Sequence, residues 1–340
     1  MRLLAKLMGF RCPFRQRRKR TTPEQRPSGI LAMALASLAV FGLSAGLRGQ
    51  NPADQAAVFR SDTRLVVLHA TAVDKTGHLI TNLPESAFQV YENNVEQKIK
   101  SFKREDIPIS LGLVIDNSGS MRDKRHKVAA ASVDLVRDSN PQDEVFIVNF
   151  NDEAFLDTPG DFTNDTKVME QALGKLDSRG GTAMRDALRM SIDHLKHKAH
   201  KDKKVILVVT DGNDNASMVS LEGLVKEAQQ SEVIIYAIGL LSEEERREAK
   251  RAQRALDALT TSTGGKAFYP KELSEVDNIA HQVARDIRNQ YTITYTPSHP
   301  ELDGSYRQIK VIANGPNKPV VRTRTGYYAT PEKSSGKPAS

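Results

Sequence analysis

Short apolar runs alternate with helical patterns between residues 107 and 288. Four runs rich in β-branched residues are candidate strands: Leu111–Ile115, Val145–Phe150, Val205–Val209 and Val233–Ile238. Their apolar residues are continuous rather than alternating, which is typical of strands buried on both faces of a parallel sheet. Strands of this kind, separated by helices, predict a doubly wound α/β domain of about 180 residues.

The segments between these runs have apolar residues every three to four positions, which predicts amphipathic helices. The periods cover Val128–Val136, Met169–Leu176, Met184–Leu195, Leu221–Ala228 and Val276–Ile287. A further helix is predicted to open at a capping box formed by Ser242 and Glu245, and to close at Gly264.

Two flanking segments, residues 58–106 and 289–328, alternate between apolar and polar residues like half-buried strands. Tyr291, Ile293 and Tyr295, for example, are separated by threonines. Segments of about 40–50 residues rarely build a core alone. We therefore predict that they pair into one small β-sandwich with the α/β domain inserted between them. Two separate β additions remain the alternative.

Both ends of the chain differ in composition from its body. Residues 1–28 hold nine basic residues and one acidic residue, and the apolar run Ile30–Leu47 follows. At 18 residues this run is close to the ~20 that span a bilayer, so residues 1–47 are predicted to be a signal peptide or a retained signal anchor. Residues 48–57 are predicted to be a linker, and the Lys/Ser/Pro-rich residues 329–340 a disordered tail.

The location of the basic charge limits what it says about partners. The 340-residue chain has a net charge of +7, but the 312 residues after position 28 carry 40 basic and 41 acidic residues. The near-neutral body gives no reason to expect nucleic acid binding. If the basic end stays in the cytoplasm, the body is extracytoplasmic and touches a membrane only through its N-terminal segment. The single cysteine, Cys12, excludes an intramolecular disulfide and a paired-cysteine zinc site.

Oxygen-bearing side chains follow the predicted strands. In doubly wound folds, ligands bind beyond the carboxyl ends of the strands. Asp116, Ser118 and Ser120 follow the first strand, Asp211 follows the third, and Thr182 comes after two glycines directly before a helix. Two carboxylates and three hydroxyls suit Mg²⁺, which prefers hard oxygen ligands. With so few carboxylates, a bound ion would accept a further carboxylate from a partner protein.

These residues also carry a family resemblance. Asp116-x-Ser118-x-Ser120, Thr182 and Asp211-Gly212 resemble the metal-ion-dependent adhesion site of von Willebrand factor type A domains, over residues 107–288. The wider chain resembles a bacterial group of related proteins through Asp74-x-x-Gly77, Asp214-Asn215 and a tail that reads Tyr-x-Ile-x-Tyr-x-Pro…Arg-x-Gly-Tyr-Tyr. The resemblance implies a Rossmann-like domain that binds Mg²⁺ or Mn²⁺ and a protein ligand presenting Glu or Asp, and that is usually not an enzyme.

Neighbouring polar residues are interpreted separately. Asp214 and Asn215 are candidates to hydrogen-bond to the five ligand residues without binding the ion themselves. Asn151 and Asp152 are interpreted as turn residues. Three histidines, His194, His197 and His200, lie among lysines. On a helix, the i+6 spacing would point His200 away from the face shared by His194 and His197. They are interpreted as a solvated basic helix end rather than a zinc site.

Two further hypotheses use the same domain. The protein could be a subunit of a membrane-associated assembly, because it resembles the Bat-type membrane proteins that carry this domain. It could also be a metal-dependent hydrolase, which needs a general base beside the ion. Asp214 is the only nearby candidate for that base.

Overall fold

The computed structural model describes residues 65–174, 178–242, 245–316 and 318–331. The chain divides into two compact units, residues 1–60 and 61–340, and every described residue belongs to the second. The predicted signal segment 1–47, the linker 48–57 and most of the predicted tail 329–340 lie outside the described residues. Within the described part, no helix is both long enough and apolar enough to cross a membrane.

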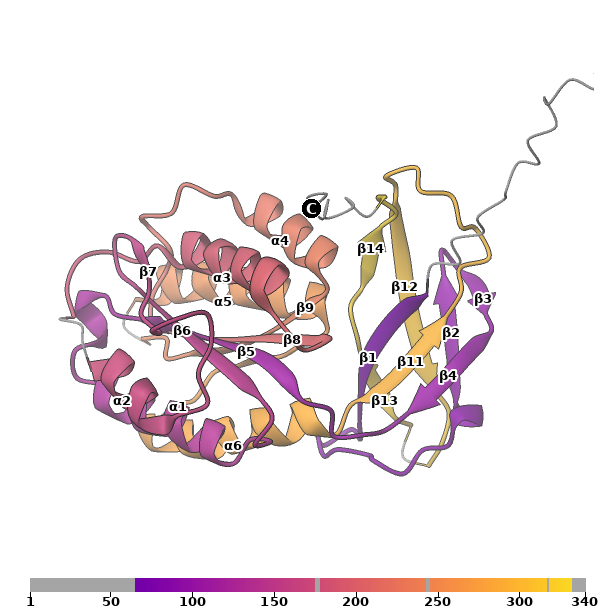
Figure 1. Cartoon of the computed structure of the whole chain (residues 1–340), viewed down its shortest axis with the longest axis horizontal. Coiled ribbons are helices and arrows are strands. Elements are labelled where there is room, and N and C mark those ends of the chain that lie inside the picture. Colours follow the sequence, from indigo (N-terminus) through magenta and orange to yellow (C-terminus); the bar gives the residue numbers. More distant parts are fainter. Residues whose placement is uncertain (1–64, 175–177, 243–244, 317, 332–340) are drawn as a thin grey trace, which may run out of the picture. The chain divides into compact units, whose positions relative to one another are not determined.

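A six-stranded sheet forms the centre of the α/β domain (Figure 1). Its spatial order is β10-β9-β8-β5-β6-β7. The strands are β5 (Ile109–Asp116), β6 (Glu144–Phe150), β7 (Ala154–Leu156), β8 (Lys203–Thr210), β9 (Val233–Gly239) and β10 (Ala267–Phe268). All pairs are parallel except β6 with the edge strand β7. The four predicted strands are therefore confirmed, and the order places β5 and β8 side by side.

Helices cover both faces of this sheet (Figure 1). One face packs against α1 (Arg125–Arg137), α2 (Thr166–Gly174) and α6 (Val276–Arg288). The other face packs against α3 (Met184–Lys198), α4 (Leu221–Ser231) and α5 (Arg246–Thr263). Continuous apolar strands supply alternate side chains to these two cores, as expected for a sheet buried on both faces. The predicted doubly wound α/β class is confirmed.

The start of α5 differs from the prediction. Glu245, not Ser242, occupies the position before the first helical residue, and its side chain makes no capping hydrogen bond. The predicted capping box is therefore wrong, because the helix begins about one turn after Ser242. The predicted end is confirmed: Gly264 is left-handed at φ +87°, and a Cβ atom there would lie 2.6 Å from the backbone of Thr323 and Arg324.

Strands from the two flanking segments form a β-sandwich. Its sheets have the orders β13-β1-β11-β4 and β14-β12-β2-β3. The strands are β1 (Val66–Val73), β2 (Phe88–Glu92), β3 (Val95–Gln97), β4 (Ile99–Lys103), β11 (Tyr291–Tyr295), β12 (Tyr306–Ala313), β13 (Val320–Arg322) and β14 (Gly326–Tyr328). Each sheet combines strands from both segments, and one apolar core joins the two sheets. The pairing of the N-terminal and C-terminal segments is thus as predicted.

Three single-turn 3₁₀ helices complete the described elements: η1 (Glu85–Ala87), η2 (Gly119–Met121) and η3 (Leu273–Glu275). Of these, η2 matters most for the site, because it lies between the end of β5 and the start of α1 and carries Ser120.

Candidate metal centre

The last residue of β5, Asp116, is buried and held by hydrogen bonds on both carboxylate oxygens. Its Oδ1 accepts from the backbone N–H of Ser118 at 2.8 Å, and its Oδ2 accepts from the hydroxyl of Thr210 at 2.6 Å. Thr210 ends the neighbouring strand β8. The parallel register of the two strands therefore fixes the carboxylate at the carboxyl edge of the sheet.

Burial makes this carboxylate costly to ionise. Burial, with a smaller contribution from the charge of Asp211, raises the pKa of Asp116 to about 6 against the lowering effect of hydrogen bonds from Thr210 and Ser118. A cation close to a buried carboxylate favours its ionised form. The electrostatics of Asp116 thus suit a position next to a positive ion.

The hydroxyl of Ser120 joins residues that are far apart in the chain. It donates to Asp211 Oδ1 at 2.8 Å and lies 3.2 Å from the Ser118 hydroxyl. Oxygens on adjacent corners of a Mg²⁺ octahedron, with bonds of about 2.1 Å, lie about 3 Å apart. The spacing and chemistry of these three oxygens therefore fit a small divalent cation.

Thr182 approaches the same edge from a third loop. The Thr182 hydroxyl lies 3.6 Å from the place that a Cβ atom on Gly212 would take, which puts it beside Asp211. The backbone carbonyl of Gly180 accepts from the N–H of Gly119 at 3.4 Å, so the loop before α3 is tied to the loop after β5. The five predicted site residues thus come from the end of β5 and from the connections after β5, before α3 and after β8, at one end of the sheet.

Asp152 has a role that the sequence interpretation missed. The sequence suggests a turn residue, but the Asp152 Oδ1 accepts from the backbone N–H of Gly181 at 2.8 Å. The contact fixes the glycine pair that precedes Thr182. Its position after β6, the strand beside β5, is the one sequence signal that places it at this edge.

Asp214 and Asn215 face different parts of the neighbouring loop. The side-chain oxygen of Asn215 accepts from the N–H of Thr182 at 2.9 Å. The carboxylate of Asp214 instead accepts from the backbone and guanidinium of Arg185 at 2.7 and 3.0 Å, and from the Ser217 hydroxyl at 2.7 Å. Asp214, the candidate base of the hydrolase hypothesis, is thus occupied at the start of α3.

Lys124 is a second residue that the sequence interpretation missed. Its ammonium group donates to Asp211 Oδ2, and the Asp211 side chain is fully buried, whereas that of Lys124 is 31% exposed. Lys124 occupies the position just before α1, in the short connection that follows η2. The positive charge of Lys124 is therefore paired with Asp211, one of the two carboxylates among the five predicted site residues.

The three histidines each make a different contact. His194 and His197 bond to the carbonyls of Asp161 and Asp193, and His200 pairs with Glu144. Among the described residues, no group of three or more His, Cys, Asp and Glu side chains is placed to hold a metal ion. The five-oxygen cluster does not depend on such a group, since three of its members are hydroxyls.

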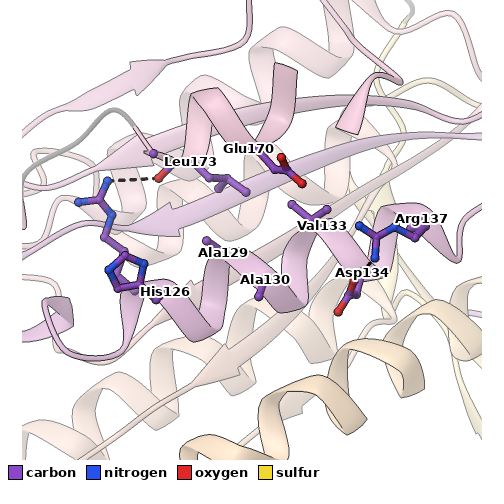
Figure 2. A pocket seen from close by; sticks show the side chains of 10 residues that line it. His126, Ala129, Ala130, Val133, Asp134, Arg137, Glu170 and Leu173 are labelled. Carbon is purple, nitrogen blue, oxygen red and sulfur yellow. Dashed lines mark hydrogen bonds and ion pairs between the residues drawn. The ribbon is translucent and has the colours of Figure 1, made fainter. Parts of the chain in front are cut away.

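A separate cavity of about 460 Å³ lies between α1 and α2 (Figure 2). Its floor is apolar, with Ala129, Val133 and Leu173. The Arg125 guanidinium donates to the Leu173 carbonyl at 3.2 Å, and Arg137 pairs with Asp134 along α1. The cavity is lined by helices rather than by the loops that carry the five oxygens, so it is distinct from the candidate metal centre.

Comparisons with known families and solved structures show what the chain resembles. Residues 111–213 match the family model of the von Willebrand factor type A domain. The comparison with curated proteins gave no match. The von Willebrand factor type A protein from Catenulispora acidiphila is 14% identical at a TM-score of 0.46, over 79% of this chain and 75% of that one.

Two other solved structures are similar. The vWF domain of the type V pili tip protein Mfa5 from Porphyromonas gingivalis is 15% identical at a TM-score of 0.42, over 54% of this chain and 97% of that one. Proximal thread matrix protein 1 from the mussel byssus, in a structure with a zinc-occupied MIDAS (metal-ion-dependent adhesion site) motif, is 16% identical at a TM-score of 0.45. The match covers 58% of this chain and 50% of that one. The match spans only part of some similar structures: 49% of another crystal form of proximal thread matrix protein 1 and 63% of the PilB minor pilin from Streptococcus sanguinis.

Proposed function

We propose that this protein is a divalent-metal-dependent protein-binding module, because residues 111–213 match the family model of the von Willebrand factor type A domain. Asp116, Ser118 and Ser120 would hold the ion directly, and Thr182 and Asp211 would hold it directly or through water. Mg²⁺ or Mn²⁺ suits this donor set, because all five side chains offer hard oxygen atoms.

The observation that carries the proposal is the approach of Ser120 to Asp211. Their oxygens lie 2.8 Å apart although the residues are 91 positions apart in the chain. Such a contact requires the loops after β5 and β8 to converge. A helix cap or a local turn at Asp116-x-Ser118-x-Ser120 would not bring Asp211 into the same cluster.

The charge balance of the cluster indicates what kind of partner it takes. When bound, the ion would act as a Lewis acid and would remain electrophilic, because the five side chains include only two carboxylates. A Glu or Asp side chain from a partner protein would supply a further oxygen ligand. We propose that such an acidic residue is the ligand. The role of this chain's residues is to hold the oxygens in place before the partner arrives.

The proposed location follows from the sequence. Residues 1–28 are strongly basic and residues 30–47 are apolar, which is the arrangement of a secretory signal or signal anchor. We propose that the body is extracytoplasmic, as a periplasmic, secreted or membrane-anchored protein. A subunit of a membrane-associated assembly, the alternative given above, would use the same site and the same location.

Thermal melting of residues 48–340 tests the metal site. Mg²⁺ or Mn²⁺ should raise the melting temperature of the wild type in a saturable way, because an ion that binds only the folded state stabilises it. Asp116→Ala and Ser120→Ala should abolish or sharply reduce the rise. Ser120→Ala is needed because Asp116 is buried and its loss can destabilise the fold directly.

Ser132→Ala is the matched control for the loss of a hydroxyl. Ser132 is buried on α1 and donates to the Val128 carbonyl. It should change the melting temperature equally with and without ion. A wild type that melts at one temperature in Mg²⁺, in Mn²⁺ and in EDTA would overturn the metal site, and so would an unchanged ion response in both site variants.

Selection from a displayed peptide library tests the carboxylate ligand. Peptides retained in Mg²⁺ and released by EDTA should share a Glu or Asp, and its replacement by Gln or Asn should abolish retention. The Ser120→Ala protein should retain none of them. Metal-dependent peptides without an acidic residue would overturn the proposed partner chemistry while leaving the metal site intact.

A further inference from the structure

We propose that Lys124 is a built-in competitor of the divalent cation, and that an ion bound directly to Asp211 must displace its ammonium group. The proposal rests on the metal site proposed above and deepens it. It assigns to Lys124 the role of setting how much divalent ion the site needs.

The Lys124–Asp211 pair uses the oxygen that the ion would need. Asp211 Oδ1 accepts from Ser120 at 2.8 Å, and Oδ2 accepts from the Lys124 ammonium group. Asp211 is fully buried at its side chain, so water does not compensate its charge. Without a bound ion, Lys124 therefore supplies the positive charge that this buried carboxylate requires.

The neighbouring cations are engaged elsewhere. The Arg122 guanidinium donates to the Ser178 carbonyl at 3.3 Å, and the Arg125 guanidinium donates to the Leu173 carbonyl at 3.2 Å. Lys127 pairs with Asp277 on α6. Lys124 alone among these four residues of the β5–α1 connection and the first turn of α1 contacts the oxygen cluster.

Competition follows from simple electrostatics. An ammonium group and a divalent ion on the same carboxylate oxygen would lie within a few ångströms of each other, where two positive charges repel strongly in a buried site. Lys124 can leave at modest cost, because its side chain is 31% exposed and its stem reaches the surface. The exchange releases a positive charge at the rim of the site each time an ion binds.

The experiment compares Lys124→Met with Lys127→Met in residues 48–340. Methionine keeps the length of the stem and removes the charge. Isothermal titration with Mn²⁺ gives the dissociation constant, and melting in EDTA and in saturating Mn²⁺ gives the stability of each state. Lys127 is the matched control, because it also forms an ion pair from α1, but with Asp277 on α6.

Competition predicts opposite effects on the two states of Lys124→Met. The dissociation constant for Mn²⁺ should fall by about tenfold or more, because the ion no longer breaks a charged hydrogen bond. The melting temperature in EDTA should fall, whereas that in saturating Mn²⁺ should stay within about 2 °C of the wild type. Lys127→Met should leave the dissociation constant unchanged and lower both melting temperatures alike.

The other outcomes separate this inference from the metal site itself. A dissociation constant that is unchanged or weaker in Lys124→Met, with an ion response in the wild type, overturns the competitor role and leaves the metal site standing. Binding that appears only in Lys124→Met supports competition in its strongest form. If neither protein binds Mn²⁺ or responds to it in melting, the proposed metal site fails, and the role of Lys124 fails with it.

Discussion

The carboxylate of Asp152 fills the space that a side chain on Gly180 would need. A Cβ atom on Gly180 would lie 2.0 Å from Asp152 Oδ2, and Gly180 has a left-handed backbone at φ +77°. The left-handed backbone favours glycine, and an added methyl group would force the Asp152 carboxylate to move. The same carboxylate holds the N–H of Gly181, so the loop that presents Thr182 depends on this close approach.

Gly180→Ala should therefore damage the metal site as well as the fold. The new methyl group would push Asp152 away, release Gly181 and shift Thr182. We expect a lower melting temperature in EDTA and a much smaller rise on adding Mn²⁺, measured by thermal melting.

Gly160→Ala is the matched control. Gly160 has nearly the same backbone angle, φ +79°, but a Cβ atom there would meet nothing within 4 Å. The free energy of unfolding of Gly160→Ala should fall by only about 1 kcal/mol, the cost of a left-handed backbone at alanine, and its response to Mn²⁺ should be unchanged. Equal ion responses in the two variants would show that the Asp152–Gly180 contact does not position Thr182.

Asn215 and Asp214 give a second prediction, because only one of them touches the ligand loop. Asn215 accepts from the N–H of Thr182, whereas Asp214 is bound to Arg185 and Ser217. Asn215→Ala should weaken Mn²⁺ binding by about 10-fold or more, as loss of a supporting contact behind a ligand does. Titration calorimetry measures this change directly.

Asp214→Ala should behave in the opposite way. It removes the acceptor at the start of α3, so the free energy of unfolding should fall while the dissociation constant for Mn²⁺ changes little. A larger loss of ion affinity in Asp214→Ala than in Asn215→Ala would contradict the assignment.

Much of this arrangement could be predicted from the sequence. The continuous apolar strands gave the parallel sheet, because a strand buried on both faces has no polar side to alternate with. Once Asp116 and Asp211 are assigned to the ends of strands, the parallel topology brings them to one edge. The alternating flanking segments predicted the shared sandwich for a similar reason, since neither segment could bury its apolar face alone.

Lys124 and Asp152 could not be predicted in the same way. Their roles depend on which side chain contacts a neighbouring loop, and the hydrophobic periodicity of the sequence carries no information about such contacts. The prediction of a capping box at Ser242 was wrong for a related reason. A capping pattern involves only a few residues, and tertiary contacts decide at which residue the helix begins.

His69 on β1 predicts a loss of stability in mild acid. It is partly buried, and burial together with the charges of Lys203 and Arg324 lowers its pKa from 6.5 to about 3. Between these values the unfolded chain binds a proton that the folded protein does not. Stability should therefore fall as the pH drops below 6.5, by up to about 1.4 kcal/mol per pH unit.

His69→Gln should remove this part of the acid sensitivity. Urea unfolding at pH 7.5, 6.0 and 5.0 gives the free energy of unfolding of both proteins. The raised pKa of Asp116 acts in the opposite direction below pH 6, but it is present in both proteins and cancels in their difference. Parallel pH profiles for the wild type and His69→Gln would rule out His69 as the source.

Glu92 ties the two segments of the sandwich together through buried tyrosines. Its carboxylate, on β2, accepts from Tyr295 on β11 at 2.7 Å and from Tyr327 on β14 at 3.0 Å. Tyr295→Phe leaves a buried carboxylate with one fewer donor, so the free energy of unfolding should fall by about 1.5–3 kcal/mol. Urea unfolding at neutral pH measures the loss.

Tyr306→Phe separates this effect from the loss of any tyrosine hydroxyl. Tyr306 is 38% exposed and bonds to Gln229 and Thr325, so water can replace its contacts and the loss should stay below about 1 kcal/mol. In a Glu92→Gln background the cost of Tyr295→Phe should also shrink, because the acceptor is then uncharged. If Tyr295→Phe costs the same in both backgrounds, the negative charge of Glu92 adds nothing to the stabilisation that the Tyr295 hydroxyl provides, and the proposed role of this carboxylate is wrong.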